Sequence, residues 1–300
     1  MHPLSNILVI QGVTGSGKSD LAYSIAKEEN GVIIRADSRQ IYKYADIGTN
    51  KSRYPDIEVE LIDIKEPDET YSAYQFALNA TEIIQNIIKR GKKVIIEGGT
   101  AYYINMLTGN IPEVDLVLQT EHADKTVFEI QELFQRELPE AYNKLNNSER
   151  HNPQRLLKNY SKAKQRSTEN SRTEKFLPEA IVVEKVAIQI SMEKLTENLI
   201  KRTSRMMHDG LTEEAAWLVE RYGLNTYTAG SIGYREFYEF IEKTYGVYDK
   251  DEIAKQIRKL TDRELHDIES LIALHNRQYA KRQMTWLKKD REIRWIEAKS

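Results

Sequence analysis

The chain has 300 residues, of which 40% are hydrophobic and 30% are charged. This is enough to build one large or two medium cores beneath a strongly charged surface. There are no cysteines, which excludes disulfides, thiolate catalysis and cysteine-based zinc sites. No apolar run is long enough to span a bilayer and no signal peptide is recognisable, so we expect no membrane contact and a cytoplasmic location.

The formal net charge of -2 weighs against nucleic-acid binding, because phosphate contacts need Lys and Arg. The charge is unevenly distributed, however. Residues 276–294 contain seven basic side chains against Asp290 and Glu292, and residues 158–166 are also basic. Both stretches could face phosphate, although ordinary solvated helix faces are the commoner explanation of such runs.

The first part of the chain alternates strand-like and helix-like segments. The apolar run 7–10 is typical of a buried strand, the segment 17–29 of a helix, and the run 31–36 of a second strand. Further strands are predicted at 61–64, 94–96, 180–190 and 293–296, and helices over 72–91 and most of 192–289. This alternation predicts an α/β fold with a parallel sheet covered by helices on both faces.

The composition changes at about Pro112. From there to Pro178 the chain is rich in Glu, Lys, Gln and Asn and poor in apolar residues, which predicts exposed helices forming a separate insert. We therefore expect three segments: residues 1–111 as the first part of the core, 112–180 as a helical insert, and 181–300 as the completion of the core with basic C-terminal helices.

Residues 12–19, with the sequence Gly-Val-Thr-Gly-Ser-Gly-Lys-Ser, fit the phosphate-loop pattern G-x-x-x-x-G-K-[ST] between a predicted strand and a predicted helix. Glycines let successive backbone N–H groups curl around an anion, and the following helix adds its positive end. The Lys18 ammonium can reach phosphate oxygens, and the Ser19 hydroxyl can bind Mg²⁺. The candidate phosphate ligands are Gly12, Thr14, Gly15, Ser16, Gly17, Lys18 and Ser19.

This loop predicts a di- or triphosphate ligand, and so a P-loop NTPase-like fold, without deciding the reaction. A nucleoside triphosphatase would have an apolar strand ending in Asp to complete the Mg²⁺ site. The strand at 94–96 ends instead in Glu97-Gly98-Gly99-Thr100. Glu97 could stand in for that Asp, which leaves a P-loop small-molecule kinase as one alternative.

Asp37 directly follows the second predicted strand. Ligands of open parallel sheets bind at the carboxyl ends of the strands, so Asp37 should lie at the same edge as the phosphate loop. A carboxylate there could accept a proton from a nucleophile while the loop holds a leaving diphosphate. Capping a turn, or binding Mg²⁺ through water, would explain its position equally well.

Several segments together resemble the tRNA dimethylallyltransferase family. Asp37-Ser38-Arg39-Gln40-Ile41-Tyr42, followed by Asp46-Ile47-Gly48-Thr49, is similar to the stretch after that family's second strand. Five more segments fit in the same order: 61–64, 71–73, 98–100, 232–237 and the run Arg-Gln-Tyr-Ala-Lys-Arg-Gln-Met-Thr-Trp at 277–286. The resemblance covers residues 7–110 and 192–296, and within 112–180 only the segment 152–155.

The resemblance implies transfer of a dimethylallyl group from dimethylallyl diphosphate to N6 of the adenosine just 3′ of the tRNA anticodon. By similarity, the phosphate loop holds the diphosphate with Mg²⁺, Asp37 is the general base, and Thr100 contacts tRNA. Lys18 and an arginine such as Arg202 can stabilise the negative charge that collects on the leaving diphosphate. The insert is expected to close over the anticodon stem-loop, and a monomer is expected. The expected tRNA contacts are Asp37, Ser38, Arg39, Gln40, Thr100, Gln154, Arg155 and Lys158, together with Arg277, Gln278, Lys281 and Arg282 of the basic run. Tyr102, Tyr103 or Tyr279 could stack on the target base, although packing roles are more common for such tyrosines.

Several positions depart from the family pattern, among them the loop residues 13–15 and the residues 58–60, and three departures bear on binding. Asn198 stands where an arginine is expected, Asn276 where a threonine is expected, and Lys158 replaces a second arginine. These changes should affect donor affinity and tRNA register more than the chemistry. Besides the kinase, two alternatives stay open: an enzyme that prenylates free adenine nucleotides, and a tRNA-binding relative without catalysis.

Overall fold

The computed structural model describes residues 6–52, 54–109, 111–112, 127–146, 149–150, 153–167 and 173–297. The chain divides into two compact units. The first falls within Met1–Tyr71, Glu82–Tyr103 and Glu179–Ser300, and the second within Ser72–Thr81 and Ile104–Pro178. The three-segment division expected from the sequence, with boundaries after residues 111 and 180, stays a prediction.

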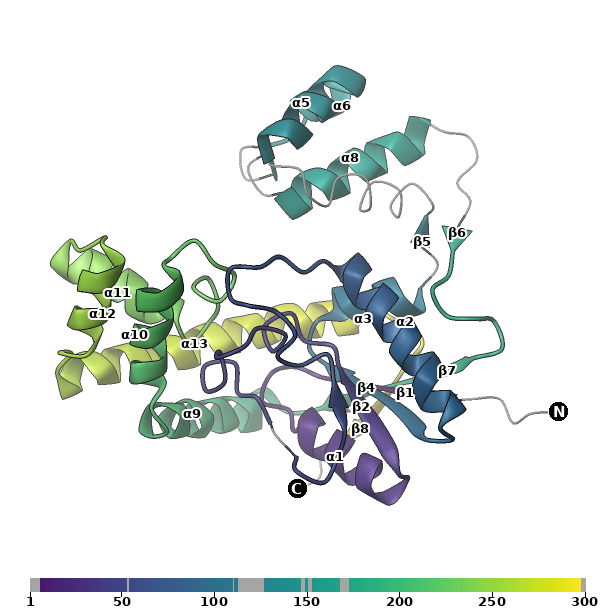
Figure 1. Cartoon of the computed structure of the whole chain (residues 1–300), viewed down its shortest axis with the longest axis horizontal. Helices are drawn as coiled ribbons and strands as arrows, with labels where there is room; N and C mark the ends of the chain where they lie inside the picture. Colours follow the sequence, from purple (N-terminus) through teal and green to yellow (C-terminus); the bar gives the residue numbers. More distant parts are fainter. Residues whose placement is uncertain are drawn as a thin grey trace. The chain divides into compact units, whose positions relative to one another are not determined.

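The first unit is built on a six-stranded sheet in the order β3-β2-β4-β1-β7-β8. Figure 1 labels β1, β2, β4, β7 and β8 of this sheet. Every neighbouring pair of strands in this sheet is parallel, which confirms the predicted α/β architecture. The strands are β1 (Asn6–Gln11), β2 (Gly31–Arg35), β3 (Val59–Glu60), β4 (Lys93–Gly98), β7 (Val182–Gln189) and β8 (Ile293–Glu297).

Helices cover both faces of this sheet. The helices are α1 (Lys18–Glu28), α9 (Met192–His208) and α13 (Asp262–Leu287). Val186 of β7 belongs to a cluster with Ala22 of α1, whereas the next residue, Ala187, belongs to a cluster with Leu199 of α9 and Ala280 of α13. Because successive strand residues point to opposite faces, α1 covers one face and the pair α9 and α13 covers the other.

The strand predicted at 61–64 is wrong. The short strand β3 occupies the two preceding residues, and Leu61 and Asp63 both adopt left-handed backbone angles, with φ of 58° and 56°. Such angles cannot continue a strand. The carboxylate of Asp63 accepts a 2.6 Å hydrogen bond from the buried ammonium of Lys51. The apolar run is therefore a turn that positions this acid.

The helix predicted after Ser72 is confirmed as α2 (Ala73–Lys89). The Ser72 hydroxyl accepts from the Gln75 amide at 3.1 Å, and the Gln75 side chain accepts from the Ser72 amide at 2.8 Å. This reciprocal cap starts the helix. Gly91, with φ of 68°, leads the chain out of it. After β4 the chain enters α3 (Ala101–Thr108).

The C-terminal part of the first unit is helical, as predicted, and has its own core. Phe237, Ile253 and Ile268 are completely buried there. Residues of α13 enter both this core, through Ile268, and the sheet-facing cluster, through Ala280. One continuous helix thus links the two parts. Between α9 and α13 lie α10 (Leu211–Tyr222), α11 (Arg235–Tyr245) and α12 (Lys250–Ile257). In the part of the chain that the structure describes, no helix is long and apolar enough to cross a membrane.

The second unit is predominantly helical. Phe134, Tyr142, Leu156 and Tyr160 are buried together in a small core. The predicted exposed helices therefore have an inward face of their own, which the sparse apolar composition concealed. The elements are α5 (Val127–Glu137), α6 (Pro139–Asn143), α8 (Pro153–Ser167) and an antiparallel pair, β5 (Ile111–Pro112) with β6 (Thr173–Glu174).

Gly98 allows β4 to pass close to the end of β2. A Cβ atom at Gly98 would lie 2.0 Å from the carbonyl oxygen of Ala36. We expect Gly98→Ala to lower the free energy of unfolding by about 1–3 kcal/mol, since the two strands would have to separate. Urea unfolding followed by circular dichroism measures the change. Gly230→Ala is the control, because a Cβ atom there meets no atom nearer than 4.0 Å. Equal stability of the two variants would contradict the prediction.

Candidate active site

The phosphate loop connects β1 to α1, as the motif predicts. Gly15 and Gly17 have φ of 81° and 87°, a region in which residues other than glycine are strained. A Cβ atom at Gly12 would lie 2.5 Å from the Ser16 hydroxyl. Lys18 is the first residue of α1. The glycines therefore permit the tight curl that turns backbone N–H groups toward an anion at the helix N-terminus.

Gln283 of α13 joins the phosphate loop to the turn after β4. Its carbonyl oxygen accepts from the Thr14 amide at 2.8 Å, and its NH₂ group donates to the Gly99 carbonyl at 2.9 Å. The side chain is nearly buried, so each bond is shielded from competing water. The two segments that carry Thr14 and Thr100 are thereby fixed relative to each other.

Arg202 of α9 contacts the same loop through a hydrogen bond to the side chain of Thr14. One guanidinium nitrogen donates to the Thr14 hydroxyl at 2.8 Å, and the other donates to the side-chain oxygen of Asn276 at 3.0 Å. The Nε atom is buried without a hydrogen-bond partner. Burial lowers the pKa of Arg202 to about 10, and the negative charge of Asp37 opposes that shift. The guanidinium is thus cationic at neutral pH, with one donor still to be satisfied.

Asp37 and Thr100 lie together at the carboxyl edge of the sheet. The Thr100 hydroxyl accepts from the Ser38 amide at 3.0 Å, and the Thr100 amide donates to the Ala36 carbonyl at 3.2 Å. One carboxylate oxygen of Asp37 accepts from the Arg39 amide at 2.9 Å. The turn after β4 therefore holds the segment that orients the Asp37 carboxylate.

Burial and the negative charge of Asp37 both raise the pKa of two nearby tyrosines. Burial raises the pKa of Tyr279 to about 12, and the Asp37 carboxylate adds to the increase. Burial likewise raises the pKa of Tyr103, with a smaller contribution from Asp37. Tyr103 is nearly buried and donates to the Tyr71 carbonyl at 3.3 Å, which gives it a packing role. Tyr102 is half-exposed.

A family model described as IPP transferase matches residues 40–290. The chain is 33% identical to tRNA dimethylallyltransferase 1 of Citrifermentans bemidjiense, over 97% of this chain and 92% of that protein. It is also 33% identical to tRNA dimethylallyltransferase of Acetivibrio thermocellus, over 98% and 92% of the two chains. The chain belongs to the tRNA dimethylallyltransferase family. The family predicted from the sequence is thus confirmed, and the alternative functions are not favoured.

Solved structures support the same conclusion. The tRNA delta(2)-isopentenylpyrophosphate transferase of Staphylococcus epidermidis is 30% identical, with a TM-score of 0.64 over 98% of this chain and 93% of that one. A eukaryotic dimethylallyltransferase acting on tRNA has a TM-score of 0.71 at 22% identity, over 99% and 74% of the two chains. The second likeness concerns the fold alone. The P-loop NTPase-like fold class is therefore confirmed.

The segment after Asp37 is held by internal hydrogen bonds. The Gln40 side chain is nearly buried, and its NH₂ group donates to the Thr49 carbonyl at 2.9 Å. The Arg39 guanidinium donates to the Tyr227 carbonyl at 2.7 Å. Both side chains thus have structural roles here. The assignment of Ser38, Arg39 and Gln40 to tRNA contact stays a prediction.

Glu214 of α10 anchors the end of this segment, and the sequence did not reveal it. Its carboxylate accepts from the amides of Asp46, Ile47 and Gly48 at 3.1, 2.9 and 2.9 Å, and from the Tyr234 hydroxyl at 2.6 Å. Three converging amides form a small anion-binding nest. Tyr234 lies in the segment 232–237, which resembles the family, and it helps to hold residues 46–48 through its hydrogen bond to Glu214.

The basic run predicted to face tRNA lies on α13. The side chains of Arg277, Gln278, Lys281 and Arg282 are exposed, and the Arg282 guanidinium lies 5.8 Å from the centre of the Tyr279 ring. Gln283 of the same helix is nearly buried and points to the phosphate loop. One face of α13 thus contacts the phosphate loop through Gln283, and another face presents cationic side chains to solvent.

In the second unit, Lys158 is exposed on α8. The side chains of Gln154 and Arg155, also assigned to tRNA contact, lie outside the described residues. Their role stays a prediction.

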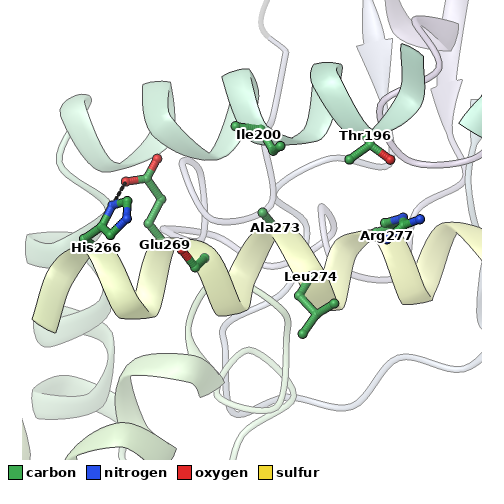
Figure 2. Close-up of a pocket in the computed structure, with 8 residues that line it drawn as sticks. Thr196, Ile200, His266, Glu269, Ala273, Leu274 and Arg277 are labelled. Atoms are coloured by element: carbon green, nitrogen blue, oxygen red, sulfur yellow. Dashed lines mark ion pairs between the residues drawn. The ribbon is translucent and has the colours of Figure 1, made fainter. Parts of the chain in front are cut away.

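A groove of about 290 Å³ lies between α9 and α13, and Figure 2 shows the side chains that line it. Ile200, Ala273 and Leu274 give it an apolar lining, with Arg277 at one end and a 4.0 Å ion pair between His266 and Glu269 at the other. Thr196 and Ser270 complete it. It contains no residue of the phosphate loop and neither Asp37 nor Thr100, so it is distinct from the site described above.

Prenyl-transferring enzymes that use diphosphate substrates generally work with a divalent metal ion. The Ser19 hydroxyl, the expected metal ligand, is partly exposed and donates to a Glu97 carboxylate oxygen at 3.1 Å. Among the described residues, no group of three or more His, Cys, Asp or Glu side chains could hold a metal by itself. A cation here would therefore need oxygen atoms from the bound substrate, which is the usual situation for Mg²⁺ in phosphate sites.

Two departures from the family pattern gain a structural explanation. The side-chain NH₂ group of Asn198 donates to the Gly15 carbonyl at 3.1 Å. Asn276 accepts from Arg202 and donates to the Ile272 carbonyl at 3.0 Å. Both uncharged side chains therefore hold residues of the proposed diphosphate site, Gly15 and Arg202, through hydrogen bonds. Their positions in the sequence marked them as unusual, but these partners are distant along the chain.

Removal of the Gln283 side chain tests whether the phosphate loop depends on it. We expect Gln283→Ala to weaken binding of inorganic diphosphate about tenfold, because two shielded hydrogen bonds of about 0.5–1.5 kcal/mol each are lost. Titration calorimetry gives the dissociation constant. Thr285→Ala is the matched control on the same helix, since that exposed hydroxyl donates only to the Lys281 carbonyl. If both variants bind like the parent, the bridge does not order the loop.

Proposed function

We propose that this protein transfers a dimethylallyl group from dimethylallyl diphosphate to N6 of the adenosine 3′-adjacent to the tRNA anticodon, releasing diphosphate. The observation that carries the proposal is that a phosphate loop, a partly buried cation and an oriented carboxylate lie together at one end of the sheet. The loop and Arg202 meet at Thr14, and the Asp37 segment is bonded to Thr100. Membership in the tRNA dimethylallyltransferase family supplies the reaction class.

Asp37 is the proposed general base. An exocyclic adenine amine is a weak nucleophile, because its lone pair is conjugated into the ring. A carboxylate that accepts an N–H hydrogen bond raises the electron density on nitrogen as the N–C bond forms, and then takes the proton. The Arg39 amide donates to one Asp37 oxygen, which fixes the orientation of the carboxylate. Thr100, next to this segment, is the proposed tRNA-contacting hydroxyl.

The leaving group is stabilised by positive charge. As the allylic C–O bond breaks, negative charge collects on the diphosphate. Backbone amides of the loop, the Lys18 ammonium and the Arg202 guanidinium are the proposed groups that stabilise it. Among the described residues, none forms a hydrogen bond or ion pair with the Lys18 side chain, so its charge is not neutralised by a carboxylate. Arg202 donates only to neutral oxygens, which leaves its charge available as well.

Mg²⁺ is the proposed metal. The donor set suits it, because a serine hydroxyl and phosphate oxygens are hard oxygen ligands. Ser19 would hold the ion, which supplies further neutralisation of the diphosphate charge when bound. The hydroxyl of Ser19 lies at the start of α1, where the phosphates of a ligand in the loop are expected.

The proposed tRNA surface includes the exposed side chains of α13. Unpaired bases of an anticodon loop can be turned out at a cost of only a few kcal/mol, which suits a site that reacts with a single adenine. The contacts proposed in the second unit are those of Gln154, Arg155 and Lys158. We further propose that the protein acts as a monomer in the cytoplasm.

The direct test incubates the purified protein with dimethylallyl diphosphate, Mg²⁺ and unmodified tRNA, followed by mass spectrometry of the nucleosides. We expect N6-dimethylallyl adenosine from the parent and a loss of about 100-fold or more in rate with Asp37→Asn, because the base is removed. Asp68→Asn, a change at an exposed carboxylate, should react like the parent. Absence of product with the parent protein would overturn the function, and full activity of Asp37→Asn would overturn the assigned base.

The α13 surface has its own test. We expect Arg277→Ala with Lys281→Ala to raise KM for tRNA and to reduce the salt dependence of tRNA binding, each lost phosphate contact lowering the slope by about one. The KM for dimethylallyl diphosphate should not change. Lys259→Ala, an exposed lysine on the chain segment after α12, is the control. An unchanged salt slope would place the tRNA elsewhere, and equal use of AMP and tRNA would favour a free-nucleotide acceptor.

A further inference from the structure

Glu97 is a buried acid directly beside the phosphate loop. It is the penultimate residue of β4 and pairs in register with Ile10 of β1, two residues before the loop begins. Its side chain is 1% exposed, and both oxygens have partners. One oxygen accepts from the Ser19 hydroxyl at 3.1 Å, and the other forms an ion pair with the guanidinium of Arg35.

Arg35 is equally buried, at the end of β2. A buried ion pair contributes little net stability, because desolvation of both charges offsets their attraction. An apolar pair would fill the same space at no such cost. The Ser19 hydroxyl, which donates to this pair, is also the hydroxyl expected to bind the metal. Packing alone therefore does not explain why a charged pair is buried at this position beside Ser19.

The separation of the two oxygens suits a metal ion. Mg²⁺ binds oxygen at about 2.1 Å in octahedral geometry, so two adjacent ligands lie about 3.0 Å apart. The Ser19 hydroxyl and the Glu97 oxygen are 3.1 Å apart. A serine hydroxyl rotates freely, so its hydrogen can turn away when a cation binds both oxygens. Metal-bound carboxylates are commonly oriented by an outer hydrogen-bond partner, which is the position of Arg35.

We propose that Glu97 and Ser19 are adjacent ligands of the Mg²⁺ that accompanies the diphosphate, and that Arg35 is a positioning residue for Glu97. The inference rests on the proposed function, in which the loop binds a diphosphate with Mg²⁺. It adds a second protein ligand to Ser19. The remaining positions of the ion are filled by diphosphate oxygens and water, in keeping with one carboxylate from the protein.

The test compares diphosphate binding with and without metal. Titration calorimetry measures the affinity for inorganic diphosphate in excess Mg²⁺ and again in EDTA. In Glu97→Gln we expect at least tenfold weaker binding with Mg²⁺, because a metal ligand is lost. In EDTA the variant should bind as tightly as the parent or more tightly, because a negative charge beside the anion is removed. A purely structural role of Glu97 would weaken binding under both conditions.

Ser19→Ala should show the same selective loss in Mg²⁺. Glu239→Gln, which neutralises an exposed carboxylate on α11, should bind like the parent under both conditions. Glu97→Gln leaves the Arg35 charge unpaired, and this could unfold the protein. The double variant Arg35→Met with Glu97→Met avoids the problem, because apolar replacement of a buried pair is often neutral for stability. It too should lose the Mg²⁺-dependent part of binding and keep the rest.

Two results would overturn the inference. One is an unchanged Mg²⁺ effect in either Glu97 variant, and the other is a parent protein whose diphosphate affinity does not depend on Mg²⁺. The proposed function is tested separately. A selective loss in Glu97→Gln would support the metal ligand even if the parent formed no prenylated tRNA, whereas that failure would overturn only the reaction.

Discussion

Two hydrogen bonds from one side chain hold the site together. Gln283 accepts from the Thr14 amide and donates to the Gly99 carbonyl, so the phosphate loop and the turn carrying Thr100 have a fixed separation. The constraint extends further, because α13 is a single helix of 26 residues that also packs in the C-terminal helical core through Ile268. A displacement of this helix in the C-terminal core would therefore also displace Gln283 and the phosphate loop bonded to it.

The charged groups of the site follow a consistent arrangement. Arg202, beside the loop, donates only to the neutral oxygens of Thr14 and Asn276, so its positive charge is not cancelled by a bonded carboxylate. Arg35 lies deeper and is paired with Glu97. A polyanionic ligand needs uncancelled cations nearby, whereas a fully buried cation needs a counter-ion. The arrangement satisfies both needs within the same sheet edge, and Asp37 stays oriented by a backbone amide.

Much of the site could be predicted from the sequence, for identifiable reasons. The phosphate loop is a local motif whose flanking elements are decided by adjacent residues, and Asp37 follows from the rule that ligands bind at the carboxyl ends of parallel strands. The turn at Leu61 escaped prediction, because an apolar run does not reveal the left-handed angles of Leu61 and Asp63. Asn198 and Asn276 were recognised as departures that remove cations or hydroxyls. Their hydrogen bonds to Gly15 and Arg202 depend on residues 183 and 74 positions away.

The sequence by itself determined the α/β class, the phosphate loop, the position of Asp37 and the family, because each depends on residues that are neighbours along the chain or on a run specific to that family. The tertiary structure decided how those parts are held: Gln283 against Thr14 and Gly99, Glu214 against the amides of residues 46–48, and Arg35 against Glu97. Such contacts join segments far apart in the chain, and no local pattern selects their partners. The phosphate loop is thus visible in the sequence, while Glu97, the acid proposed to share a metal ion with Ser19, became a definite candidate only when β1, β2 and β4 were seen side by side.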